Sequence, residues 1–320
     1  MDLLRSVMGT NRSPYARLVR HSLLAMLALA VGGCESPIPV DGSWEPASTL
    51  PDVSGLARLS DSLYLAVHDA KLPEEQASPR VSLVRVSGSN GGATWRPVAV
   101  RWPTSDASSD LESVAAIPGT RFLLLSESGD DGGAYRRIFL AELVEDGVRF
   151  AEAVRWPTDV FNVEGTAAAR VDGRLVFLYA ERSQDSLHTR IRWAPLQPTP
   201  LAFGEFREVV FSVPAAAGMN RPVSAMEVDP DGWIYVASTF DPDVDDGPYR
   251  SMVWRIGRVR TEGTAATVQL DSTARLIARS DGIKIESLAI RNLQDGSRQL
   301  IVGSDDEDLG AVIRPLPLVP

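Results

Sequence analysis

Residues 110–129, Asp110-Leu-Glu-Ser-Val-Ala-Ala-Ile-Pro-Gly-Thr-Arg-Phe-Leu-Leu-Leu-Ser-Glu-Ser-Gly129, form one recognisable unit. Two apolar runs, Leu111–Ile117 and Arg121–Ser126, flank a Pro118-Gly119 turn, and Glu127 follows the second run. Short apolar runs separated by a tight turn are typical of a β-hairpin. We therefore predict two antiparallel strands joined at Pro118-Gly119.

The same unit recurs along the chain. Val163-Glu-Gly-Thr-Ala with Leu175–Glu181 is a second copy, and Ile285-Glu-Ser-Leu-Ala with Gln299–Asp305 is a third. Two looser copies occupy residues 53–69 and 223–239. Repeats of about 50 residues with four short strands each are typical of propeller blades. The sequence thus predicts an all-β, five-bladed β-propeller, with a six-bladed propeller as the alternative.

The end of the chain predicts how the propeller closes. A third strand follows each hairpin and a fourth follows in the first four copies, among them Trp95–Trp102 in the first. The fifth copy reaches Pro320 with only three strands. The segment Trp44–Leu50 precedes a proline, as three of the four predicted fourth strands do. We expect this N-terminal strand to complete the last blade, which would bury the free edges of the first and last blades.

Residues 1–33 predict an export signal. Four arginines precede the apolar run Leu23–Val31, which is too short to span a bilayer. Val31-Gly-Gly-Cys34 resembles a bacterial lipobox, which implies a lipidated Cys34 and membrane attachment through its acyl chains; an incidental thiol is the alternative. Residues 34–43 then form a tether and 44–320 a single domain. Glu35 after the cysteine favours the outer over the inner membrane of the cell envelope.

Composition limits the classes of partner. The 320 residues are 44% hydrophobic, which suffices for one large domain with its own core. Cys34 is the chain's one cysteine, so an exported form has no internal disulfide. Removing residues 1–33 takes away four of 32 basic and one of 42 acidic residues and leaves a net charge of −13. Such an acidic body argues against nucleic-acid binding.

The repeat places acidic residues at one opening. Equivalent positions of the inner strands lie at one depth around a propeller axis, and the ends of the second strands lie on the same face. The expected inner ring is Ser54, Glu112, Glu164, Ser224 and Glu286, and the neighbouring ring is Asp69, Glu127, Glu181, Thr239 and Asp305.

Seven crowded carboxylates require compensation, by a cation, by basic side chains or by protonation. An arginine begins the third strand of four blades (Arg80, Arg136 or Arg137, Arg190, Arg250), so the neighbouring ring is expected to be salt-bridged. No such partner recurs for Glu112, Glu164 and Glu286. We predict these three as ligands of a metal, with Ca²⁺ as the candidate ion, or of a small molecule; capping of loop amides is the alternative.

Other candidates are few. His68 beside Asp69 is a candidate general base, with a hydrogen-bonding role as the alternative. Lys71 and Lys284, the chain's two lysines, map to the same face and would suit an anionic ligand. Asp69, Glu127, Glu181 and Asp305 complete the predicted ligand-binding set. Tyr135 and Tyr249 either flank the opening or pack in the core.

The Leu111-Glu-Ser-Val-Ala, Val163-Glu-Gly-Thr-Ala and Ile285-Glu-Ser-Leu-Ala motifs resemble those of the phytase-like (esterase-like) propeller family. They are also similar to the wider calcium-bearing propellers around gluconolactonases and strictosidine synthases. The resemblance implies a propeller with a cation at Glu112, Glu164 and Glu286. The chain departs from it at Ser54 and Ser224 and lacks the dense Lys/Arg cluster that a phytate ligand requires.

Two functions follow as hypotheses. The first is a lipid-anchored propeller of the cell envelope that binds a small molecule, a cation or a protein at its acidic face. The second is a calcium-dependent hydrolase of esters or phosphoesters that uses the same opening, with a metal-activated water.

Overall fold

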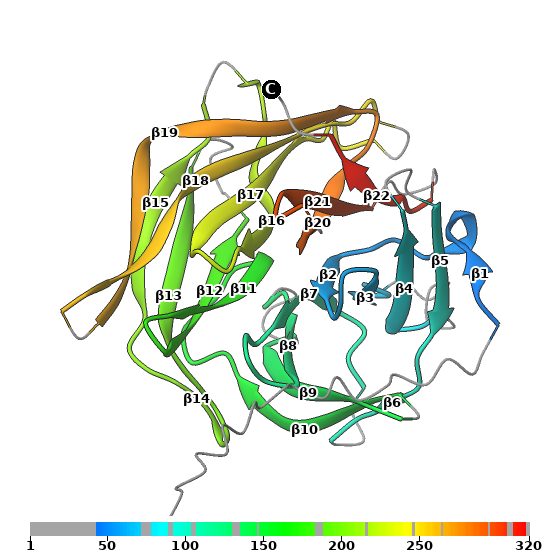
Figure 1. Cartoon of the computed structure of the whole chain (residues 1–320), viewed down its shortest axis with the longest axis horizontal. Helices are drawn as coiled ribbons and strands as arrows, with labels where there is room; N and C mark the ends of the chain where they lie inside the picture. The colour runs from blue at the N-terminus through cyan, green and yellow to red at the C-terminus, as the bar shows by residue number, and fades with distance from the viewer. Residues whose placement is uncertain are drawn as a thin grey trace, which may run out of the picture. The chain divides into compact units, whose positions relative to one another are not determined.

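Five small β-sheets stand around a common axis (Figure 1). In each sheet the first strand lies nearest the axis: β2 (Gly55–Arg58), β7 (Leu111–Ala116), β11 (Val163–Val171), β16 (Arg221–Val228) and β20 (Ile285–Asn292). The fold is therefore the predicted five-bladed β-propeller rather than the six-bladed alternative.

The computed structural model describes residues 43–71, 78–88, 92–103, 107–129, 135–145, 147–182, 188–214, 217–244, 247–263, 265–293, 295–305 and 310–317. The predicted signal peptide, Cys34 and nearly all of the tether lie outside these residues. Within the described part of the chain, no helix has the length and apolar character needed to cross a membrane.

The predicted hairpins are confirmed. Strand β7 pairs with β8 (Phe122–Glu127), and Gly119 in their turn has a φ of +72°. Strand β11 pairs with β12 (Arg174–Glu181) through Asp172 and Gly173, whose φ angles are +47° and +78°. Two consecutive residues of positive φ favour a type I′ turn, which an Asp-Gly pair forms at low cost. The residues of these turns thus favour the hairpin that begins each of these two blades.

The remaining strands complete the blades. Blade 1 adds β3 (Leu63–Val67), β4 (Val81–Ser87) and β5 (Gly92–Pro97), and blade 2 adds β9 (Arg137–Val144) and β10 (Gly147–Arg155). Blade 3 adds β13 (His188–Pro198), β14 (Leu201–Phe203) and β15 (Arg207–Ser212), blade 4 adds β17 (Trp233–Phe240), β18 (Arg250–Glu262) and β19 (Ala265–Asp281), and blade 5 adds β21 (Arg298–Ser304) and β22 (Ile313–Leu316).

One predicted strand is divided between two blades. Residues 95–102 were expected as the fourth strand of blade 1, but only β5 belongs to that blade. Strand β6 (Val100–Arg101) pairs in parallel with β10 and extends blade 2. The chain thus changes sheets at Val98 and Ala99, before the turn to the next inner strand.

The predicted closure of the propeller is wrong. Strand β1 (Glu45–Pro46) pairs with Trp95 and Thr94 of β5, so the N-terminal segment extends blade 1 instead of completing blade 5. Side-chain contacts explain the preference. The Trp95 indole donates a hydrogen bond to Thr49 Oγ1 at 3.0 Å, and the Arg85 guanidinium lies 4.1 Å from the Trp44 ring centre. Both contacts hold the segment on blade 1.

Packing between sheets closes the propeller. Val53, Leu56 and Tyr64 of blade 1 share a buried cluster with Ala289 and Ile301 of blade 5. Four further apolar clusters join the successive pairs of blades, so the core is distributed between the faces of neighbouring sheets. Each fully buried Leu, Ile or Phe contributes about 1.5–3 kcal/mol, so these faces dominate the stability.

Polar contacts strengthen the same junction. The Val53 amide donates to the Ser304 carbonyl at 3.0 Å. The nearly buried Arg291 of β20 donates to the carbonyl oxygens of Asp61 (3.3 Å) and Gly88 (2.8 Å) in two turns of blade 1.

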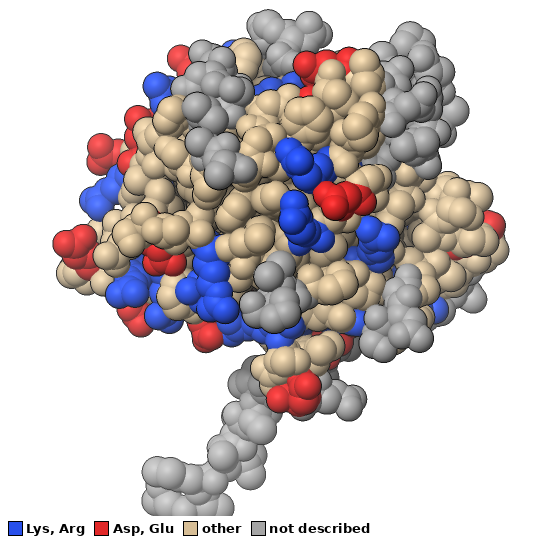
Figure 2. Space-filling model, turned by 90° about the horizontal axis from the view of Figure 1, so that it is seen from above, with Lys and Arg blue, Asp and Glu red and all other residues tan. Residues whose placement is uncertain are grey.

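On the side of the propeller that Figure 2 shows, Lys and Arg form several separate groups among mostly uncharged residues.

Candidate functional site

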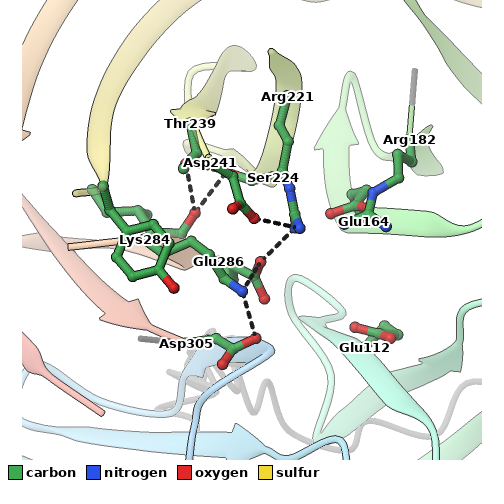
Figure 3. A network of polar contacts seen from close by, with 12 residues as sticks. Glu112, Glu164, Arg182, Arg221, Ser224, Thr239, Asp241, Lys284, Glu286 and Asp305 are labelled. Atoms are coloured by element: carbon green, nitrogen blue, oxygen red, sulfur yellow. Dashed lines mark hydrogen bonds and ion pairs between the residues drawn. The ribbon is translucent and has the colours of Figure 1, made fainter. Parts of the chain in front are cut away.

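A local irregularity in three inner strands aims three glutamates at the axis. The pairing of β7 with β8 skips Glu112, and the first hairpins of blades 3 and 5 skip Glu164 and Glu286 in the same way. A bulge of this kind redirects the side chain of the residue that leaves the ladder. The three carboxylates surround one opening (Figure 3), as the repeat predicted.

Close contact between inner strands makes this opening shallow. A Cβ on Gly55 would lie 2.8 Å from Ser113 Cα, and one on Gly165 would lie 2.7 Å from the Met226 nitrogen. Glycine is therefore required at both positions. The cavity beneath, lined in part by Ser54, Glu164 and Glu286, has a volume of about 10 Å³. That is about the space of one water molecule, so a ligand would bind above it.

The first group of charges joins blades 1 and 2 around Lys71. Its ammonium nitrogen lies 3.1 Å from Asp69 Oδ2, 2.5 Å from Asp110 Oδ1 and 3.1 Å from Glu112 Oε1. Asp110 is fully buried, and its other oxygen accepts hydrogen bonds from the amide and hydroxyl of Ser128. The backbones of Asp69 and Asp110 also form a bridge, which fixes the two segments together.

Proton affinities in this group depart from ordinary values. Burial raises the pKa of Asp69 to about 6, although Lys71 opposes the rise. Burial and the charge of Asp69 raise the pKa of Glu112 well above its usual range. Burial disfavours the charged form of Lys71, but the three carboxylates outweigh it and raise the lysine pKa. The ammonium therefore stays charged, while the carboxylates compete for it.

The second group lies in blades 4 and 5. Arg221 reaches Asp241 Oδ2 at 2.6 Å and Glu286 Oε1 at 2.9 Å (Figure 3). Lys284, nearly buried, lies 3.5 Å from Glu286 Oε1 and 3.2 Å from Asp305 Oδ2. Burial and the charge of Asp305 raise the pKa of Glu286 well above its usual range, although the charges of Lys284 and Arg221 oppose this rise.

The third glutamate also has a basic partner, since Arg182 Nε lies 2.8 Å from Glu164 Oε1. The expectation that no base accompanies Glu112, Glu164 and Glu286 is therefore wrong. Their partners come from positions beside the hairpins: Lys71, Arg182 and Lys284 follow or precede a hairpin strand by a few residues, and Arg221 begins one. The prediction placed Lys71 and Lys284 on this face but did not pair them with the glutamates, and it missed Arg182, Arg221 and Asp110.

The neighbouring ring is salt-bridged as expected, but partly by other bases. Arg137 binds both oxygens of the buried Glu127, with Nη2 2.6 Å from Oε1. Glu181 pairs with Arg192 at 3.2 Å rather than with Arg190, and Asp69 pairs with Lys71 rather than with Arg80.

The other arginines named in the prediction have different partners. Arg80 donates to the carbonyl oxygens of Ser78 and Ser108, and Arg250 to those of Ala217 and Gly218. Arg136 pairs with the exposed Asp159.

The carboxylates do not fit a calcium ion as they stand. Oxygens of Asp69, Asp110 and Glu112 lie within 4.8 Å of one another, a spacing that suits a metal. The Lys71 ammonium, however, lies within 3.1 Å of all three and takes the position of a cation. Calcium needs six to eight oxygens at 2.3–2.6 Å, so it would have to displace the bases. Calcium remains a prediction from the sequence.

His68 is fully buried and serves hydrogen bonding. Its Nδ1 donates to the Asp52 carbonyl at 2.7 Å and its Nε2 accepts from Ser82 Oγ at 2.9 Å. Burial lowers the pKa of His68 to about 4, so the imidazole is neutral. The hydrogen-bonding alternative explains these contacts, and a general base would need access that this position lacks.

The two tyrosines accompany the two lysines. The Tyr135 ring centre lies 6.0 Å from the Lys71 nitrogen, and that of Tyr249 lies 5.8 Å from the Lys284 nitrogen. An aromatic face at this distance stabilises an ammonium group. Tyr249 is buried, whereas Tyr135 is partly exposed.

No protein-family model matches this sequence, and no curated protein matches it. Among solved structures, an α-L-arabinofuranosidase from Lactobacillus brevis is 13% identical, with 82% of this chain and 90% of that chain covered and a TM-score of 0.48. An endo-arabinase from Bacteroides thetaiotaomicron is 10% identical, with 87% and 98% covered and a TM-score of 0.47. A putative 6-phosphogluconolactonase from Bacteroides uniformis is 14% identical, with 84% and 89% covered and a TM-score of 0.38. Such distant likeness concerns the fold alone; the phytase-like resemblance and the lipoprotein signal remain predictions.

Proposed function

We propose that the protein is a binding propeller, held at the cell envelope by lipidated Cys34, that takes a small polar ligand at the mouth. The mouth denotes the opening formed by seven acids and four bases: Asp69, Asp110, Glu112, Glu164, Asp241, Glu286 and Asp305, with Lys71, Arg182, Arg221 and Lys284. This gathering of charges from all five blades is the observation that carries the proposal.

The balance of charge indicates the kind of ligand. Acids outnumber bases at the mouth, and each named base is already paired with at least one carboxylate. Side chains such as Asp69 and Asp305 are partly exposed, at 32% and 23%. Carboxylates accept hydrogen bonds and attract positive charge. A ligand with hydroxyl groups and an ammonium group suits this surface better than an anion does.

The alternative, a calcium-dependent hydrolase, receives less support. It requires a metal-bound water and a base beside it. Bases of the protein lie against the glutamates proposed as metal ligands, and His68 is buried. We expect no turnover of p-nitrophenyl esters or phosphates, with or without calcium. Turnover that disappears in a Glu112→Gln variant would favour the hydrolase.

The ligand proposal is tested with three sugars that differ in charge. Calorimetric titration should rank glucosamine above glucose and glucose above glucuronate. Glu112→Gln and Asp305→Asn should each weaken glucosamine binding about tenfold, which corresponds to about 1.4 kcal/mol. Glu262→Gln, at an exposed position at the end of β18, is the matched control and should change nothing. Strongest binding of glucuronate, or no binding of any sugar, would refute the proposed ligand class.

Anchoring is tested separately. A Cys34→Ser chain expressed in a bacterial host should leave the membrane fraction and lose incorporation of labelled palmitate. Retention of the label would assign the acyl chain to another residue.

A further inference from the structure

Two arginines lie side by side on the outer strands of blade 4. In the pairing of β18 with β19, Arg255 is directly opposite Arg275. Residues opposite each other in antiparallel strands share one face of the sheet, with Cβ atoms about 4.5–5.5 Å apart. Like charges at such positions destabilise the pairing. An anion bound between the two guanidinium groups would remove that cost.

The two arginines lack acidic partners. Among the residues that the structure describes, no ion pair joins Arg255 or Arg275 to a carboxylate. The Nε atom of Arg255 is buried and has no acceptor in the same part of the chain. The acids of the adjoining turn, Asp229 and Asp231, are both bound by Arg298 of blade 5. Because a buried donor without an acceptor is costly, the arrangement favours a ligand that accepts hydrogen bonds.

Trp233 of β17 holds one of the two guanidinium groups in place. The centre of its ring lies 4.1 Å from the guanidinium carbon of Arg255 and 5.1 Å from that of Arg258. Arg258 is in turn fixed by a hydrogen bond to the Asp231 carbonyl at 2.7 Å. A guanidinium that stacks on an aromatic ring keeps its N–H groups in its own plane, where they can reach a ligand. Arg255 is therefore positioned before binding, which lowers the entropy cost of binding.

The number of strands in blade 5 leaves this part of blade 4 accessible. Tyr235, which pairs with Arg255, packs against the apolar cluster that joins blades 4 and 5, so the two arginines lie on the face toward blade 5. In the described residues blade 5 has three strands and blade 4 has four, with β19 outermost (Figure 1). Strand β19 thus has no counterpart there in blade 5. Accordingly, Arg275 is exposed and Arg255 is partly exposed.

We propose that Arg255 and Arg275 bind a phosphate dianion on the outer part of blade 4. Each planar guanidinium can donate two parallel hydrogen bonds to phosphate oxygens, and the two groups together balance both negative charges. The dianion is either inorganic phosphate or the phosphate group of a monoester. This site shares no residue with the mouth and takes a ligand of the opposite charge.

The test is calorimetric titration with inorganic phosphate, at constant ionic strength and about pH 8, where phosphate carries two charges. Arg255→Gln and Arg275→Gln should each weaken phosphate binding about tenfold. Arg85→Gln is the matched control, because Arg85 also stacks on a tryptophan, at 4.1 Å from the Trp44 ring centre, but lies opposite Leu63 and Thr94 instead of an arginine. Methyl phosphate distinguishes the two sources: equal affinity indicates a monoester site, and much weaker binding indicates a site for the free ion.

Melting temperatures separate binding from folding. Because Arg275 is exposed and is one of two like charges, Arg275→Gln without phosphate should melt no lower than the wild type. Phosphate at about ten times its dissociation constant should raise the melting temperature of the wild type by roughly 2–4 °C and that of Arg275→Gln by much less.

Two results would overturn the proposal. One is the absence of phosphate binding by the wild type. The other is equal phosphate binding by the wild type, Arg255→Gln and Arg275→Gln, because the ion would then bind elsewhere, for example at the mouth. Failure of the sugars to bind at the mouth would leave the phosphate site unaffected.

Discussion

The ammonium nitrogen of Lys71 in blade 1 lies 2.5 Å from Oδ1 of Asp110 in blade 2. Asp110 is fully buried, and its second oxygen is held by Ser128. The lysine thus serves as a cation built into a group of three carboxylates. An ion pair with a buried member is costly to break, because the remaining charge stays desolvated.

Lys71→Met should lower the free energy of unfolding by about 2–4 kcal/mol at pH 7 because Asp110 loses its partner. The cost should be smaller at pH 5, because burial raises the pKa of Asp69 to about 6 and that of Glu112 well above its usual range, so these two carboxyl groups can take up protons once the lysine is absent. Urea unfolding at both pH values measures it. Arg58→Gln, which breaks an exposed pair with Asp61, is the control and should cost under about 1 kcal/mol. An equal cost of Lys71→Met at pH 5 and pH 7 would contradict the electrostatic explanation.

Calcium should leave the melting temperature of the wild type unchanged, because Lys71 takes the cation position. In Lys71→Met the three carboxylates are free to bind a metal. Calcium at about ten times its dissociation constant should then add about 1.4 kcal/mol and raise the melting temperature by roughly 2–4 °C. Thermal scans with calcium and with a chelator measure the shift, and a further Glu112→Gln change should reduce it. A calcium-dependent rise in the wild type would instead support the metal site predicted from the sequence.

His68 should make stability depend on pH. Its pKa is about 4 in the folded protein and 6.5 as the ordinary value. Below pH 6.5 the unfolded chain binds a proton that the folded chain does not, so this contribution is present above pH 6.5 and is lost as the pH falls to about 4. The slope is at most about 1.4 kcal/mol per pH unit.

His68→Gln should remove that slope, whatever its own cost in hydrogen bonds. The raised pKa of Asp69 acts in the opposite direction in the same window, so the difference between variant and wild type is the informative quantity. Urea unfolding between pH 4.5 and pH 7.5 provides it, with His188→Gln as the control for an exposed histidine. Parallel stability curves for wild type and His68→Gln would show that the buried imidazole does not titrate as described.

Arg291 and Arg170 test how the propeller closes. Both lie one residue before the end of an inner strand, and both donate to carbonyls in a turn of the neighbouring blade. Arg291 is 6% exposed and joins blade 5 to blade 1, whereas Arg170 is exposed and joins blade 3 to blade 2. Arg291→Met should cost about 2–3 kcal/mol, because it removes the charge-assisted hydrogen bonds of a buried guanidinium to two turns of blade 1, and Arg170→Met should cost under about 1 kcal/mol. Chemical unfolding of both variants compares them. Equal costs would mean that Arg291 has no special part in closure.

Local patterns predicted the blades and the three glutamates. Alternating apolar residues and an Asp-Gly or Pro-Gly turn act over a few neighbouring positions, so the hairpins of residues 111–127 and 163–181 were readable without a structure. The repeat then placed Glu112, Glu164 and Glu286 at equivalent positions, and they do surround one opening. The sequence could not place their partners. Lys71 and Glu112 are separated by 41 residues, and Arg221 and Glu286 by 65.

The chain by itself therefore determined the number of blades, the hairpin turns and the acidic character of one face. Tertiary structure alone decided which base compensates which acid and that β1 joins blade 1. The reason is physical: strand formation depends on neighbours along the chain, whereas ion pairing and edge pairing depend on which surfaces meet once the sheets have packed.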